Sequence, residues 1–195
     1  MQLGEVFNDL IVMAMACDVC RVFALEITQS NPNRAIEWPG ISRDDVQNPD
    51  GAQGLHRLAH AATGDPDRVL FGKVNATYAN LYASLLKKLD AVQDGNGRTL
   101  LDNSVAVLGN AYGDSSRHDG KDHSWENTPF IVGGSGGGFF QGGKIINAGG
   151  KSHTQVLGSV LEYFDIDRSP APSAPGDGAF GDPGYSYDTL PGLKA

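Results

Sequence analysis

Five side chains between Tyr112 and Trp125 are of the types that bind divalent metal ions: Asp114, His118, Asp119, Asp122 and His123. Carboxylate oxygens and imidazole nitrogens together suit zinc, manganese or a similar divalent ion. We expect zinc, manganese or calcium as the cofactor. Arg117 and Lys121 lie in the same stretch and are able to pair with an anionic substrate. The pattern predicts a metal and substrate site. A hydrophilic connection whose charges are merely solvated is the alternative interpretation.

Two more histidines, His56 and His60, are four residues apart. On a helix they would share one face and could hold one metal ion. Leu55, Leu58 and Ala59 around them are equally typical of a plain helical turn with surface histidines. The spacing therefore leaves both interpretations open.

The metal-binding side chains lie between two apolar runs, "SVAVL" at 104–108 and "PFIV" at 129–132. Both runs are typical of buried strands. Connections at the ends of buried strands are where α/β folds place their chemistry. The glycine run at 133–138 is a weak candidate for anion binding, because it lacks the lysine and helix start of a P-loop.

Three helices and a further strand are expected around these runs. Apolar residues from Leu3 to Cys17 recur every three or four positions, which predicts a helix that buries one stripe. Asp65 and Pro66 begin a long amphipathic helix that reaches Val92. "RVFALEI" at 21–27 is typical of a buried strand, and 156–164 has helical spacing.

The order of these elements favours an α/β domain with helices covering a sheet. We expect this domain to occupy residues 1–168. Residues 169–195 are rich in proline and glycine, which predicts an extended tail.

Cys17 and Cys20 form the chain's single C-x-x-C pair. A redox pair or half of a zinc site is the functional interpretation, but no second cysteine pair completes a zinc site. We therefore expect two packed small thiols, since cysteine without a disulfide is commonly buried.

The formal net charge is −8, so the basic footprint of a nucleic-acid-binding protein is absent. No run approaches the roughly 20 apolar residues that span a bilayer. Glu5 and Asp9 precede the most apolar segment, Leu10–Ala16, where a signal peptide would carry basic residues. No export signal is therefore visible, and the direct start of the helical pattern at Met1 suggests a truncated beginning.

The order of several segments resembles a known group of proteins. The most specific is "LLDNSVAVLGNAYGDSSRHDGKDHSWENTPFIVGG", with "LIVMAMACDVCRVFALEI", "GLHRLAH" and "SHTQVLGSVLEYFDI" around it. Over roughly residues 3–167 the chain resembles the C-terminal half of uncharacterised bacterial proteins in the alkaline-phosphatase/sulfatase-like superfamily. The resemblance implies an α/β fold with a mostly parallel sheet, helices on both faces, and its N-terminal part outside this chain. Many such proteins are exported, so it also implies a periplasmic or extracellular location.

Active members of that superfamily hydrolyse phosphate or sulfate esters with one or two divalent metal ions. Carried over, the resemblance implies metal binding by His56 or His60, and by Asp114 with His118 or His123; these five residues are the expected metal ligands. His153 matches a histidine before the last helix in one of the related families, and with Arg117 and Lys121 it completes the expected substrate-binding residues. Capping of the helix that follows, by Ser152 or His153, is the alternative interpretation of this position. The superfamily's nucleophile belongs to the absent N-terminal part, so no catalytic residue is assigned.

Two functions therefore follow from the sequence. The first is a metal-dependent hydrolase of a small anionic ester or polymer, or the C-terminal part of one. The second is a non-catalytic structural or binding protein, which could assemble with another protein chain.

Overall fold

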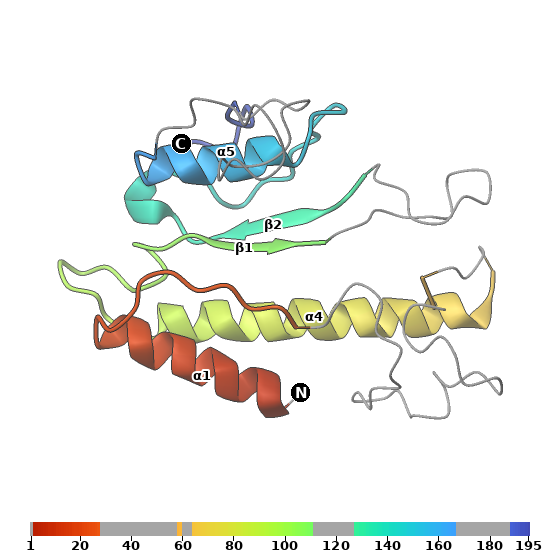
Figure 1. Cartoon of the computed structure of the whole chain (residues 1–195), viewed down its shortest axis with the longest axis horizontal. Coiled ribbons are helices and arrows are strands. Elements are labelled where there is room, and N and C mark those ends of the chain that lie inside the picture. Colours follow the sequence, from red (N-terminus) through yellow and green to blue (C-terminus); the bar gives the residue numbers. More distant parts are fainter. Residues whose placement is uncertain (1, 28–57, 60–63, 111–126, 167–187) are drawn as a thin grey trace, which may run out of the picture. The chain divides into compact units, whose positions relative to one another are not determined.

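The computed structural model describes residues 2–27, 58–59, 64–110, 127–166 and 188–195 (Figure 1). They belong to two compact units. The helical unit is Met1–Val92 with Asn110–Thr128, and the hairpin unit is Gln93–Gly109 with Pro129–Ala195.

The helical unit is built on the long helix α4, Pro66–Asp90. Its N-cap is Asp65, whose carboxylate accepts a hydrogen bond from the main-chain N–H of Asp67 at 2.9 Å. Proline at the first helical position has no N–H to leave unsatisfied. The predicted start of this helix is confirmed. The helix ends at Asp90, so the glycine turn that includes Gly95 follows it rather than capping it.

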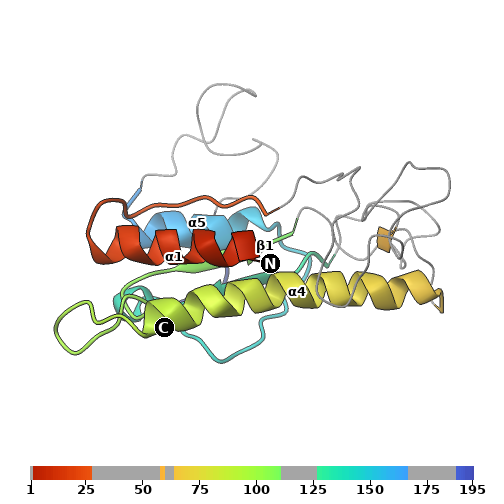
Figure 2. The same ribbon diagram turned by 90° about the horizontal axis from the view of Figure 1, so that it is seen from below.

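The second helix of this unit is α1, Gln2–Ala16, which runs beside α4 (Figures 1 and 2). Asn8 donates from Nδ2 to the main-chain oxygen of Leu81 at 2.9 Å. One turn earlier, a Cβ on Gly4 would lie 2.7 Å from the Leu81 side chain. The two helices are therefore in close contact through a small residue and an amide.

Charged groups hold the same helix pair together. Lys88 Nζ lies 2.8 Å from Glu5 Oε2 and 2.5 Å from Asp9 Oδ1. Ser84 donates its hydroxyl to Glu5 at 2.8 Å. The hydrogen bond from Lys88, followed by that from Ser84, holds the pKa of Glu5 below its ordinary value.

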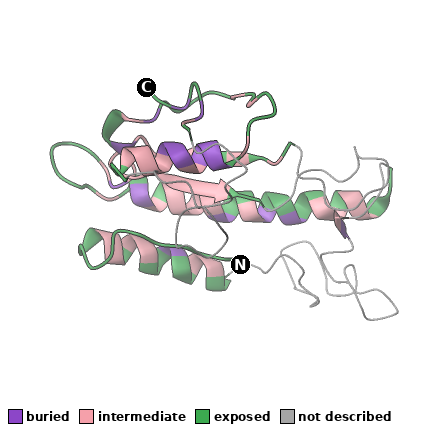
Figure 3. Cartoon of the chain, turned by 45° about the horizontal axis from the view of Figure 1, so that its top comes forward, coloured by how far each residue is buried: buried purple, intermediate pink, exposed green. Residues whose placement is uncertain are grey.

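The predicted helix over α1 is confirmed, but its predicted buried stripe is wrong. Leu3, Val6, Phe7 and Leu10 are between 41% and 69% exposed, whereas Asn8 is 1% exposed. Figure 3 shows that most of α1 is exposed or partly exposed. The helix turns a face with Gly4, Glu5 and Asn8 toward α4, because that face supplies the close approach and the bonds to Lys88 and Leu81.

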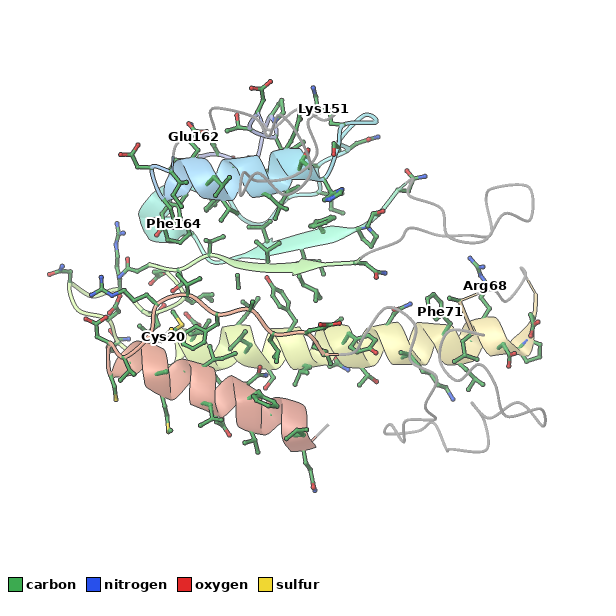
Figure 4. All side chains as sticks on the ribbon, viewed as in Figure 1. Cys20, Arg68, Phe71, Lys151, Glu162 and Phe164 are labelled. Atoms are coloured by element: carbon green, nitrogen blue, oxygen red, sulfur yellow. The ribbon has the colours of Figure 1, made fainter. Side chains whose placement is uncertain are left out.

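The core of the helical unit lies at the N-terminal half of α4. Leu58 and Val74 are buried there and are packed against Ile27, Leu70, Phe71 and Tyr78. Figure 4 labels Phe71 on this part of α4.

The hairpin unit contains strands β1, Ala106–Gly109, and β2, Phe130–Gly133, which pair antiparallel. The register places Ala106 opposite Gly133 and Gly109 opposite Phe130. A short 3-10 turn η2, Gly136–Gly138, follows β2, and helix α5 is Thr154–Tyr163. Both strands and α5 lie where the sequence predicts them, within two residues at their starts.

Helix α5 packs over the hairpin (Figure 1). The buried core of this unit is Phe140, Val156, Leu190 and Leu193, and Val105, directly before β1, packs against it with Phe130 and Val132 of β2. The last two of these come from residues 188–195, which are anchored to the rest of the unit. The N–H of Leu190 donates to the buried Ser159 hydroxyl at 2.9 Å, and that of Ala195 donates to the oxygen of Phe139 at 2.9 Å.

The predicted fold, a mostly parallel alkaline-phosphatase-like sheet with helices on both faces, is wrong. In the described parts of the chain the sheet has two strands, β1 and β2, and they are antiparallel. Parallel neighbours require a crossover connection, usually through a helix. The strands at 106–109 and 130–133 instead pair directly with each other.

The predicted strand at 21–27 is also wrong. These residues have no strand assignment, and Val22 is 76% exposed while Phe23 and Leu25 are each 39% exposed. A β-rich composition favours a strand only where another strand completes its main-chain hydrogen bonds. No such partner is present for this segment among the described residues.

Candidate functional site

Most of the predicted site lies outside the described residues. This holds for the predicted metal ligands and for two of the three predicted substrate-binding residues: His56, His60, Asp114, His118, His123, Arg117 and Lys121. Their roles stay predictions. His153 is the predicted site residue that the structure describes.

The two ends of the segment that carries most of these residues are held next to each other. Gly109 ends β1, Phe130 begins β2, and the two are Cα partners in the antiparallel ladder. A Cβ on Gly109 would lie 2.5 Å from the Phe130 ring, so glycine leaves room for that ring. The chain therefore leaves the hairpin at Asn110 and returns to it beside its point of departure.

His153 lies at this same end of the hairpin. Its imidazole stacks on the Phe130 ring, with centroids 5.6 Å apart and the planes 9° from parallel. His153 is the N-cap residue of α5, but its side chain makes no capping hydrogen bond. The Ser152 hydroxyl accepts a 3.3 Å hydrogen bond from the N–H of Thr154 instead. An exposed imidazole thus rests on an aromatic face without serving as the helix cap.

The glycine run after β2 is a structural turn rather than an anion cradle. The N–H of Gly136 donates to the Ser104 oxygen at 3.0 Å, and that of Gly137 donates to the Asp102 oxygen at 2.7 Å. Gly134 has φ +87°, and a Cβ there would lie 2.3 Å from the Ser104 oxygen. These two amides are bonded within the protein, and the run fixes β2 against residues 102–104.

The turn before β1 is held by a polar network that the sequence interpretation overlooked. Asp102 Oδ2 accepts from the Thr99 N–H at 2.8 Å, and Thr99 Oγ1 accepts from the Asp102 N–H at 3.2 Å. The N–H and hydroxyl of Thr99 lower the pKa of Asp102. Arg98 donates to the Gly137 oxygen at 3.0 Å. The signal was present in the Thr-x-x-Asp spacing, which is similar to that of a capping box.

The expectation of packed cysteines is wrong. Cys17 and Cys20 are both exposed and both without a disulfide. Cys20 donates from Sγ to the Val22 oxygen at 3.2 Å. Figure 4 labels Cys20 beyond the end of α1. The thiols are exposed because the apolar stripe of α1 that leads to them is exposed as well.

The described residues contain no group of three or more histidine, cysteine, aspartate or glutamate side chains that could hold a metal ion. None of the helices in the described ranges combines the length and apolar character that a membrane crossing requires.

Comparisons of the chain with protein-family models, with curated proteins and with solved structures gave no match.

Proposed function

We propose that this chain binds a divalent metal ion through Asp114, His118 and His123 and acts on an anionic ester of phosphate or sulfate. The activity is the one implied by the sequence resemblance at 100–134, and the parallel-sheet fold is not carried over with it. The donor set supports the proposal, because one carboxylate and two imidazoles within ten positions suit zinc or manganese.

The observation that carries the proposal is the pairing of Gly109 with Phe130. Folding of the hairpin unit already brings the two ends of the 110–129 connection together. The entropy lost when the two ends of this connection are brought together is then offset by the pairing of β1 with β2, so metal binding does not have to offset it. A metal ion has to order only the chain between two fixed ends.

The substrate class follows from charge. Arg117 and Lys121 lie among the proposed ligands in the sequence and would neutralise an anionic ester. A bound divalent ion polarises a phosphoryl or sulfuryl oxygen when substrate is present. His153, the third residue of the proposed substrate-binding set, stacks on Phe130 at the end of the hairpin where the 110–129 connection begins and ends.

A non-catalytic binding protein is the second candidate, and a separate observation favours it. Nine large apolar side chains of residues 3–25 are at least 39% exposed in the helical unit: Leu3, Val6, Phe7, Leu10, Met13, Val19, Val22, Phe23 and Leu25. Extended exposed apolar surface is typical of sites where a protein binds another protein, a membrane or a ligand.

Hydrolysis assays separate the two candidates. The purified chain is loaded with zinc, manganese or calcium and supplied with aryl phosphate and aryl sulfate esters. The proposal expects turnover that scales with protein, stops with chelator, and is lost in the His118→Ala/His123→Ala double variant. A His153→Ala variant that raises KM supports the substrate-binding role. Absence of turnover in every metal-loaded sample, with metal shown to be bound, contradicts the hydrolase and leaves the binding protein.

A further inference from the structure

The outward face of α1 has the spacing of a helix–helix seam. The spacing alternates between three and four over four residues of α1 and Cys17 directly after its end, and all five are exposed: Leu3, Val6, Leu10, Met13 and Cys17. This 3-4-3-4 pattern is that of the a and d positions that meet when two helices pack side by side. We call these five residues the α1 seam.

The contacts of α1 with α4 leave the seam uncovered. The face toward α4 contains Gly4 and Asn8, both against Leu81, and Glu5, which is bonded to Lys88 and Ser84. Leu3 is 69% exposed and Met13 is 59% exposed. In the described parts of the chain nothing buries the seam, and Figure 3 shows the exposed residues along α1.

Charge limits what can cover it. The charged residues of α1 are Glu5 and Asp9, and both are paired with Lys88. The seam itself has no charge, so it fits neither a basic nor an acidic peptide. A helix that lies on a membrane typically has lysine or arginine on its polar face. α1 has neither, and a chain with net charge −8 is repelled by anionic lipid.

A second copy of the same chain satisfies these conditions. A seam with identical a/d spacing is complementary to itself, and closed two-fold pairs are the commonest protein assemblies. The Asp9 carboxylate beside the seam is paired with Lys88 in each copy, which limits repulsion between copies.

Further apolar side chains are exposed in addition to those of the seam. Val19, Val22, Phe23 and Leu25, which follow the seam in the sequence, are each at least 39% exposed. Burial of apolar surface is the dominant favourable contribution to most protein association, so these side chains favour an interface in this unit.

We propose that the α1 seam is the interface of a homodimer, in which α1 of one copy packs against α1 of a second. The interface uses residues of the helical unit that have no part in the proposed metal site. The dimer and the metal site are therefore tested independently.

The first test measures molar mass. The full chain is analysed by sedimentation velocity from about 1 to 100 μM, and the mass of two copies is expected. Leu10→Asp places a carboxylate in the middle of the seam, where burial without a partner raises the dissociation constant at least about 100-fold. Val69→Asp is the matched control, since Val69 is 65% exposed on α4 and outside the seam. It should leave the dimer intact.

Leu10 is 49% exposed, and unchanged helix content by circular dichroism confirms that Leu10→Asp still folds. A wild-type chain that is monomeric at about 100 μM, a concentration far above the dissociation constants of stable dimers, overturns the proposal. A dimer that Leu10→Asp and Val69→Asp weaken equally, or that neither weakens, also overturns it.

Cross-linking gives a second test. Leu10 is midway between Leu3 and Cys17, so it faces its own counterpart whether the seams run parallel or antiparallel over their full length. In a Cys17→Ser/Cys20→Ser background, Leu10→Cys is expected to form an intermolecular disulfide with copper–phenanthroline as oxidant, and Val69→Cys is not. Failure of Leu10→Cys to cross-link, or equal cross-linking at both positions, contradicts the proposed interface.

Discussion

Asn8 and Leu81 are 73 positions apart in the chain, yet Asn8 Nδ2 donates a 2.9 Å hydrogen bond to the Leu81 oxygen. The asparagine is 1% exposed. An amide therefore occupies the centre of the contact between α1 and α4, while larger apolar side chains of α1 face outward. The contact with α4 therefore depends on a polar side chain, and the apolar side chains of α1 remain exposed for the proposed dimer interface.

Removal of the Asn8 amide should loosen α1 from α4. Asn8→Ala abolishes the hydrogen bond to Leu81 and leaves a gap at a buried position, which costs about 1–3 kcal/mol of unfolding free energy. Asn80→Ala is the matched control, because Asn80 is exposed on α4 and alanine has the higher helix propensity. Urea unfolding of both variants measures the difference, and equal midpoints would show that the contact contributes nothing.

The Glu5–Lys88 pair should make the helical unit sensitive to acid. The hydrogen bond from Lys88, with that from Ser84, lowers the pKa of Glu5 in the folded chain below its ordinary value of 4.5. Its stabilising contribution is therefore present above pH 4.5 and is lost as the pH falls through the lower folded value. Glu5→Gln lacks this titration.

Thermal unfolding of wild type and Glu5→Gln between neutral pH and strong acid measures the effect. The melting temperatures should differ most at neutral pH and converge in acid. If the two plots of melting temperature against pH stay parallel over the whole range, the pKa of Glu5 is the same in the folded and unfolded chains, which would contradict this prediction.

The turn after β2 should tolerate no side chain at Gly134. Alanine there adopts φ near +87°, which costs about 1–2 kcal/mol. Its Cβ also meets the Ser104 oxygen at 2.3 Å, so the backbone of residues 102–104 must move. Gly142→Ala is the control, since a Cβ at Gly142 has nothing within 4 Å and needs no positive φ.

Unfolding followed by near-ultraviolet circular dichroism reports on the aromatic residues packed around Phe140. Gly134→Ala should lower the midpoint clearly, and Gly142→Ala should change it little. A Gly134→Ala chain as stable as the control would contradict the close approach of this turn to Ser104.

Local signals in the sequence predicted individual elements well. Asp65 followed by Pro66 marks the start of α4, because the carboxylate caps and the proline needs no acceptor. The apolar runs at 104–108 and 129–132 correspond to β1 and β2. Both kinds of signal are local: the cap acts on main-chain N–H groups two positions away, and each apolar run is a single short segment.

Relationships between distant elements were not predictable in the same way. The direction in which β1 and β2 pair is decided by main-chain bonds between them, and neither strand encodes it alone. The stripe from Leu3 to Cys17 shows that α1 has an apolar face, but which face lies against α4 depends on Gly4, Asn8 and Lys88. The spacing of apolar residues in a helix predicts that the helix has an apolar face, but it does not predict which element packs against that face.

In the candidate site, too, residue types were predictable from the sequence and contacts between distant residues were not. The residue types at 114–123 predict metal chemistry from the sequence, and they lie outside the described residues. The pairing of Gly109 with Phe130 and the stacking of His153 on Phe130 required the structure, because each joins residues that are far apart in the sequence.

The number of metal ions bound per chain tests the proposed metal site without depending on the substrate. The chain is equilibrated with zinc, passed over a desalting column, and analysed for zinc per chain by elemental mass spectrometry, beside the His118→Ala/His123→Ala double variant. We expect about one zinc ion per wild-type chain, and a loss of most of it in the double variant with an unchanged circular dichroism spectrum. A wild-type chain that retains no zinc, or a double variant that retains as much as wild type, would contradict metal binding by this segment.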